Sequence, residues 1–121
     1  MMALTTELDR SADIWVLKLT GDLDYSECAS LRMSIDRLLK SAPAAAIVDL
    51  AALDYLDSSG LGLLLSLSKE YGAQGGRLAL VTNETVDNIL SLTRLNGIFS
   101  TASSREDALA ILEEPIAEHA T

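Results

Sequence analysis

An aspartate and two serines, Asp57-Ser58-Ser59, stand directly before an apolar run in this 121-residue chain. A serine hydroxyl can act as a nucleophile or accept a phosphoryl group. If the run is a helix, these serines occupy its first turn, where backbone N–H groups lack partners and the dipole is positive. That environment can hold a phosphate group. A simpler interpretation is that Asp57 or Ser58 only caps the helix.

Two glycines, Gly60 and Gly62, follow the serines. Each costs a helix interior roughly 1 kcal/mol relative to alanine. A domain tolerates that cost where another surface approaches the backbone; the alternative interpretation is that Gly60 marks close packing inside the domain. The segment lacks both the lysine of a phosphate-binding loop and the spacing of a dinucleotide-binding loop. It is not the Gly-x-Ser-x-Gly turn of a hydrolase either.

Other catalytic chemistry has few residues available. Cys28 is the single cysteine, so a disulfide framework and a zinc site of several cysteines are excluded. His119, the single histidine, is third from the end, so a hydrolase built on Ser58 would need that tail to fold back. Cys28 falls on the apolar stripe of a helix, which predicts a buried core thiol. We expect no catalytic residue, no metal and no cofactor.

The composition is that of one globular domain, with 49% hydrophobic and 22% charged residues. Nine basic and eighteen acidic residues give a net charge of 9 − 18 = −9. This charge argues against direct binding to nucleic acid or to an anionic membrane surface. The N-terminus does not resemble a signal peptide, and no apolar run approaches the ~18 residues of a membrane span. We therefore expect a cytoplasmic protein that is monomeric when free.

Hydrophobic periodicity and capping residues predict the elements. A hairpin of two strands ends at Gly21, and Asp24 with Glu27 forms an acidic capping box for the first helix. A helix capped by Asn83 places Leu95 inward. The expected strands are 4–10, 14–20, 46–50, 78–81 and 98–99.

Two further helices complete the expected order. One spans about 58–72 and is apolar nearly all round, so its leucines lie in a second layer or meet a partner. The last begins at a capping box of Ser103 and Glu106 and stops at Pro115. The order β-β-α-β-α-β-α-β-α predicts an α/β fold: a mixed, mostly parallel sheet with an antiparallel N-terminal edge hairpin and about four helices. The chain is expected to be a single domain over residues 1–121, with a core of about 4–113 and an acidic tail at 114–121.

The stretch from Asp57 to Gly62, set after the strand Ile47–Leu50, resembles the signature of STAS domains. Leu19–Asp24 resembles the family's other recognisable block, a strand that ends in Gly-acid-Leu-Asp. The likeness covers the chain from about Ile14 to Leu112. It is strongest to the stand-alone bacterial anti-sigma factor antagonists of the SpoIIAA and RsbV type, and it implies the STAS fold.

The resemblance implies a partner-switching mechanism. Such antagonists bind an anti-sigma factor that is also a serine kinase, and this binding releases a sigma factor. The kinase, which binds the ATP, then phosphorylates Ser58, or alternatively Ser59, and the antagonist dissociates. A PPM-type serine phosphatase reverses the modification. The residues expected to contact the partner are Asp22, Asp24, Asp57, Ser58, Ser59, Gly60, Leu61 and Gly62.

Two alternatives remain open at this stage. The chain could be a STAS subunit of a transporter or another signalling complex, bound constitutively through the leucine-rich surface 61–67. Asp22 and Asp24 could form a turn and a helix cap and have no role in partner binding.

Overall fold

The computed structural model describes residues 3–11 and 14–113. Its sheet has the order β1-β2-β3-β4-β5. β1 and β2 form an antiparallel hairpin, and β2, β3, β4 and β5 run parallel to one another, so the predicted mixed sheet is confirmed. The strand bounds are β1 Thr5–Ser11, β2 Ile14–Leu23, β3 Ala45–Leu56, β4 Arg77–Val81 and β5 Thr101–Ala102.

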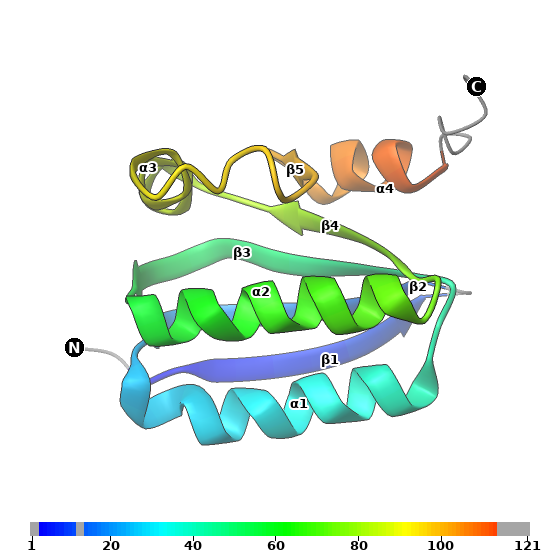
Figure 1. The fold of residues 1–121 in the computed structure, drawn as a ribbon, viewed down its shortest axis with the longest axis horizontal. Helices are drawn as coiled ribbons and strands as arrows, with labels where there is room; N and C mark the ends of the chain where they lie inside the picture. The colour runs from blue at the N-terminus through cyan, green and yellow to red at the C-terminus, as the bar shows by residue number, and fades with distance from the viewer. Residues whose placement is uncertain (1–2, 12–13, 114–121) are drawn as a thin grey trace.

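The helices alternate with the parallel strands, because parallel neighbours are joined by crossover connections. α1 and α2 pack against each other, and α4 packs over β3 and β4 (Figure 1). Among the described residues, no helix is long and apolar enough to cross a bilayer. The helical segments are the short 3-10 turn η1 Tyr25–Glu27, α1 Cys28–Ser41, α2 Ser58–Ala73, α3 Glu84–Leu92 and α4 Arg105–Glu113.

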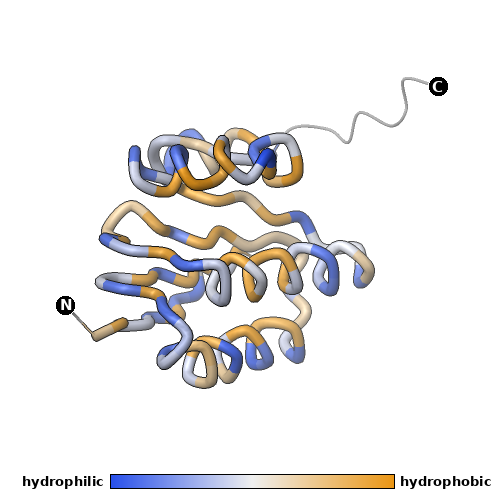
Figure 2. Tube along the Cα trace, turned by 60° about the vertical axis from the view of Figure 1, so that its left-hand side comes forward, coloured by the Kyte–Doolittle hydropathy of each residue, from blue (hydrophilic) through white to orange (hydrophobic). Residues whose placement is uncertain are grey.

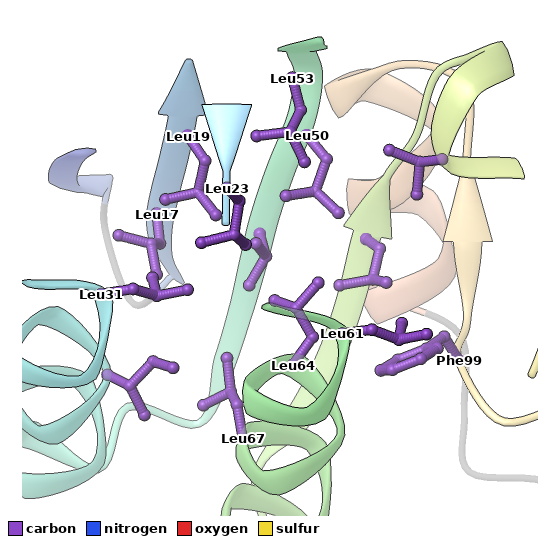
Figure 3. Packing of buried hydrophobic residues seen from close by; sticks show 14 of the residues in the cluster. Leu17, Leu19, Leu23, Leu31, Leu50, Leu53, Leu61, Leu64, Leu67 and Phe99 are labelled. Atoms are coloured by element: carbon purple, nitrogen blue, oxygen red, sulfur yellow. The ribbon is translucent and has the colours of Figure 1, made fainter. Parts of the chain in front are cut away.

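Most buried side chains belong to one hydrophobic cluster between the sheet and α1, α2 and α3. Figure 2 shows hydrophobic residues along the central strands and on the side of α1 that faces them. Leu64 and Leu67 point from α2 toward the strands in Figure 3. A smaller cluster beneath α4 contains Val16, Ile47, Ala79, Val81, Ala108 and Leu112.

Both β2 and β3 run further than the sequence predicted. Gly21 does not end β2, because its φ of 101° lets the chain pass an irregular register and continue to Leu23. β3 pairs with β4 only over Ala45–Asp49, and beyond Asp49 it follows β2 alone. This overhang of β2 and β3 was missed because Ala51–Leu56 lacks the β-branched residues typical of strands.

Asn83 supports the overhang on the side where β4 is absent. Its Nδ2 donates to the carbonyl oxygens of Leu50, Ala51 and Leu53 at 3.3, 3.1 and 2.8 Å. Its Oδ1 accepts from Val86 N at 2.9 Å, which confirms that Asn83 caps α3. One side chain thus starts a helix and replaces part of a missing strand.

The region after α3 differs from the prediction. The expected strand at 98–99 is wrong, because Phe99 is buried in the main cluster and the strand forms at Thr101–Ala102. α3 ends at Leu92 and does not reach Leu95. Thr93 follows as the C-cap of α3, and its Oγ1 donates to Ile89 O at 2.7 Å.

The last helix is also capped differently. The predicted capping box of Ser103 and Glu106 does not form, because Ser104 Oγ accepts from Asp107 N at 3.1 Å. The helix accordingly begins at Arg105. The predicted stop at Pro115 and the acidic tail 114–121 lie outside the described residues.

Candidate functional site

The carboxyl ends of β2 and β3 meet the beginnings of α1 and α2 at one end of the sheet, on the left of Figure 1. At this point Asp57 has extended backbone angles, φ −101° and ψ −179°, and α2 starts at the next residue. Asp57 Oδ1 accepts from Ser59 N at 2.9 Å and from Gly60 N at 3.1 Å. Asp57, rather than Ser58, is therefore the N-cap of α2.

Asp57 also holds the neighbouring turn in place. Its Oδ2 accepts from Tyr25 N at 3.1 Å, and its own N–H donates to Leu23 O at 3.2 Å. A single carboxylate thus bonds to the first turn of α2 and to η1. The two turns form one surface that is fixed by hydrogen bonds at both sides.

Asp24 is the N-cap of η1, as predicted, since its Oδ1 accepts from Ser26 N at 3.0 Å. The second half of the predicted capping box is wrong, because the Glu27 carboxylate accepts from Leu4 N at 2.8 Å. Cys28 follows at the start of α1 and is half-buried. Its thiol donates to Asp24 O at 3.4 Å, and burial, followed by the charges of Asp57 and Asp24, raises its pKa. The thiol therefore stays protonated at neutral pH, in line with a structural role.

The outward side of α2 presents Ser58 and Gly62, which are both exposed and lie one helical turn apart. Ser59, the next residue, is half-buried. A β-carbon placed on Gly62 meets no atom within 4 Å. The packing of the domain therefore does not require a glycine at position 62.

The inward side of the same turns is tightly packed. A β-carbon on Gly60 would lie 2.5 Å from Leu23 Cγ and 2.9 Å from Leu56 Cδ1, so the close-packing interpretation of Gly60 is confirmed. Leu61 is 6% exposed and belongs to the same buried cluster as Phe99 (Figure 3). Gly60 and Leu61 thus belong to the core of the free domain, and their contact with a partner stays a prediction.

Two further predicted contact regions are less accessible than the sequence indicated. Leu63 and Leu65 are half-buried and pack on the core, so the region 61–67 is mostly interior and offers no broad leucine surface. Asp22 lies within β2 and is 8% exposed in the free domain, and its contact with a partner stays a prediction. The predicted contacts that remain accessible at this end are Asp24, Asp57, Ser58, Ser59 and Gly62.

Tyrosines that the sequence analysis did not single out flank these residues. Tyr25 is 79% exposed and Tyr55 is 46% exposed, the former in η1 and the latter two residues before Asp57. Their position beside capping aspartates was the signal that could have identified them. The surrounding segments 19–31 and 41–68 contain no lysine or arginine, so every charged side chain they supply is acidic.

The described residues hold no group of three or more histidine, cysteine or acidic side chains able to bind a metal ion. The arrangement is suited to binding and modification. It presents an exposed hydroxyl on a rigid turn, two exposed aromatic rings and several carboxylates.

The protein-family model for the STAS domain matches residues 5–108 of this sequence. The chain belongs to the STAS domain family. It is 30% identical over 114 residues to the anti-sigma F factor antagonist of Paenibacillus polymyxa, covering 93% of this chain and 97% of that protein. It is also 30% identical over 95 residues to the anti-sigma-F factor antagonist RsfB of Mycobacterium tuberculosis, covering 78% of this chain and 77% of RsfB.

Solved STAS structures share the fold. An anti-sigma factor antagonist from Mycobacterium paratuberculosis superposes with a TM-score of 0.84 at 23% identity, over 93% of this STAS domain and 96% of that chain. Unphosphorylated SpoIIAA gives a TM-score of 0.74 at 24% identity, covering 93% of this chain and 100% of that chain. Phosphorylated SpoIIAA from Bacillus gives a TM-score of 0.68 at 24% identity, covering 88% of this chain and 99% of that chain. The predicted STAS fold is confirmed.

Proposed function

We propose that this STAS domain is an anti-sigma factor antagonist whose binding is switched off by phosphorylation of Ser58. The observation that carries the proposal is the exposed Ser58 hydroxyl on the turn that Asp57 fixes. Curated relatives named anti-sigma F factor antagonists support the role, and SpoIIAA, which shares the fold, has been solved in a phosphorylated form.

In this role the protein is a substrate and a binding partner, not a catalyst. It binds an anti-sigma factor that is a serine kinase, and the sigma factor is released in the cytoplasm. The kinase holds ATP and transfers its γ-phosphoryl group to Ser58 Oγ, with ADP and the hydroxyl proton as the other products. A PPM-type phosphatase hydrolyses the phosphoserine, and the free antagonist acts as a monomer.

The electrostatics of the site explain how one phosphate could end binding. A phosphoserine adds a charge of about −1.5 to −2 at pH 7. The Ser59 and Gly60 N–H groups already bond to Asp57, so they are not available to the new phosphate. The dianion would remain in solvent beside acidic side chains, and a partner packed on Ser58 would have to desolvate it. No conformational change of the antagonist is required.

Ser58 is favoured over Ser59 by accessibility. Ser58 is exposed at the first residue of α2, whereas Ser59 is half-buried. The test incubates the protein with MgATP and each purified anti-sigma factor kinase of its own organism, followed by mass-spectrometric mapping. We expect one phosphate on Ser58, loss of labelling in Ser58→Ala and retained labelling in Ser59→Ala. Absence of phosphate from both serines with every kinase would refute the switch.

Binding measurements separate the switch from the constitutive-subunit alternative. Ser58→Ala should bind the anti-sigma factor and escape inactivation, while Ser58→Asp should bind at least about tenfold more weakly, by like-charge repulsion and desolvation. Co-purification with a stable complex that Ser58→Asp leaves unchanged would instead support a subunit role. The 61–67 leucines are buried or half-buried against the core, which favours the switch over that alternative.

A further inference from the structure

We propose that Asn96, in the loop between α3 and β5, is a site of spontaneous deamidation with the Gly97 backbone nitrogen as nucleophile, and that the isoaspartyl product loosens the packing of Phe99. The proposal goes beyond the proposed function, because the modification needs no kinase, phosphatase or other partner. It starts within the chain itself and consumes only water.

Asn96-Gly97 is the one place where asparagine precedes glycine in the sequence. The other asparagines, Asn83 and Asn88, precede a glutamate and an isoleucine. Glycine has no side chain to hinder its own backbone nitrogen, and its backbone turns readily into the conformation that ring closure requires. The pair therefore has the local chemistry for cyclisation, which the side chain of the following residue hinders at the other two asparagines.

The loop leaves both reacting groups accessible. Asn96 and Gly97 are exposed and belong to no helix or strand of the described chain. Among the hydrogen bonds of the described residues, none has Gly97 N–H as its donor or the Asn96 side chain as a partner. The turn is closed around the pair, where Leu95 N donates to Leu90 O at 2.8 Å and Ile98 N donates to Leu95 O at 3.0 Å. The fold thus leaves the nitrogen and the side-chain amide free to approach each other.

The same structure protects the other two asparagines. Asn83 is held at both ends of its side chain, since Nδ2 donates to three carbonyl oxygens of β3 and Oδ1 accepts from Val86 N at 2.9 Å. Asn88 is exposed but lies inside α3, where regular hydrogen bonding holds the next backbone N–H. Exposure alone therefore does not select Asn96, which combines exposure, an unbonded neighbouring N–H and a glycine.

The reaction is intramolecular, which replaces a bimolecular step by the approach of neighbouring atoms. Gly97 N attacks Cγ of Asn96 to form a C–N bond, and the side-chain nitrogen leaves as ammonia with the proton that Gly97 N gives up. Water then opens the succinimide ring. Attack at Cγ leaves aspartate on an unchanged main chain, whereas attack at the main-chain carbonyl carbon leaves isoaspartate. Either product changes the formal net charge from −9 to −9 − 1 = −10.

The isoaspartyl product lengthens a loop that is packed on the core at both ends. Leu95 is half-buried against the main cluster, and Phe99 is buried within it (Figure 3). Isoaspartate inserts one extra methylene group into the main chain between them, and a close-packed core does not absorb such a shift without loss of contact. The aspartyl product adds charge alone, so comparison of the two separates the effect of the backbone from the effect of charge.

The experiment incubates the full chain at mildly alkaline pH, both natively and in guanidinium chloride, and quantifies tryptic peptides by mass spectrometry. Trypsin cleaves after Arg94, so Asn96 falls in one peptide and Asn83 and Asn88 in the preceding one. In the native protein Asn96 should convert at a rate within about tenfold of its rate in guanidinium chloride, because exposed loops open at little cost. Asn83 and Asn88 should stay intact in the native protein over the same period.

Gly97→Ala is the matched variant. A β-carbon at position 97 meets no atom within 4 Å, and the backbone there is not left-handed, so the fold accepts alanine. Conversion of Asn96 should fall by about tenfold or more, because the methyl group hinders the attacking nitrogen and restricts the backbone. Circular dichroism verifies folding. Equal conversion in this variant and in wild type would overturn the role of Gly97 N.

A native rate more than about tenfold below the rate in guanidinium chloride would show that the fold protects Asn96, and the site would be overturned. The link to Phe99 has its own test. Anion exchange isolates the modified chain, whose urea midpoint should lie below that of wild type, while Asn96→Asp should keep the wild-type midpoint. Equal midpoints for the modified chain and Asn96→Asp would overturn that link. None of these results depends on whether an anti-sigma factor binds.

Discussion

Gly60 and Gly62 stand two residues apart in α2, yet the domain needs only one of them. Gly60 faces Leu23 and Leu56 at distances that leave no room for a β-carbon, whereas Gly62 faces open space. The inward side of this turn is thus determined by packing, and the outward side is free to serve another purpose.

The largest expected effect on stability comes from a substitution on the inward side of α2. Gly60→Ala should lower the free energy of unfolding by about 2–3 kcal/mol, because the new methyl group must displace two packed leucines. Urea denaturation followed by circular dichroism measures the loss, with Gly62→Ala as the control at the neighbouring glycine. An unchanged midpoint for Gly60→Ala would mean that Leu23 and Leu56 can move aside.

A substitution of Asn83, which supports the overhang of β2 and β3, should lower stability by nearly as much. Asn83→Ala removes the donor to the carbonyls of Leu50, Ala51 and Leu53 and the cap of α3, so we expect a loss of about 2 kcal/mol. Asn83→Ser keeps a capping oxygen and should recover only part of that loss. Full recovery by serine would show that the contacts to β3 contribute nothing to stability.

The sequence predicted the order and type of the elements because apolar periodicity and caps are local properties. Asp24, Asp57 and Asn83 all proved to be helix caps. The extension of β2 and β3 was not predictable, since it depends on Asn83 reaching a strand about thirty residues earlier, a contact with no local signal. The misplaced strand at 98–99 has the same origin, because burial of Phe99 follows from tertiary packing.

The candidate site was only partly predictable. The position of Ser58 at the start of a helix followed from the segment itself, but the separation of Gly60 from Gly62 required coordinates. The burial of Asp22 was not predictable, because β2 continues past Gly21, where the sequence predicted the strand to end. Hydrophobic periodicity cannot identify exposed aromatic residues such as Tyr25, because it assigns aromatic rings to the core.

A smaller effect tests the inward side at the far end of α2. Tyr71 is fully buried, donates its hydroxyl proton to Pro43 O, and has its pKa raised by burial from 10 to about 12. Below pH 10 both folded and unfolded tyrosine are protonated, and this contribution to stability is fully present. Between pH 10 and 12 the unfolded form loses its proton first, so stability should fall with rising pH.

Tyr71→Phe serves as the control for this dependence. It should cost about 1 kcal/mol at neutral pH, for the lost hydrogen bond. It should also flatten the decline of unfolding free energy between pH 10 and 12, measured by urea titrations at each pH. An equally steep decline in the variant would assign the pH dependence to other groups.

The smallest expected effect is a gain in stability, at Gly62. It tests the comparison between the two glycines directly. Gly62→Ala should raise the free energy of unfolding by about 0.5–1 kcal/mol, because alanine favours the helix and limits the unfolded chain. The same substitution would then destabilise at position 60 and stabilise at position 62. Differential scanning calorimetry checks the sign, and a loss of stability at position 62 would mean that this glycine serves the fold after all. A gain would show that neither the packing nor the helix requires glycine at position 62.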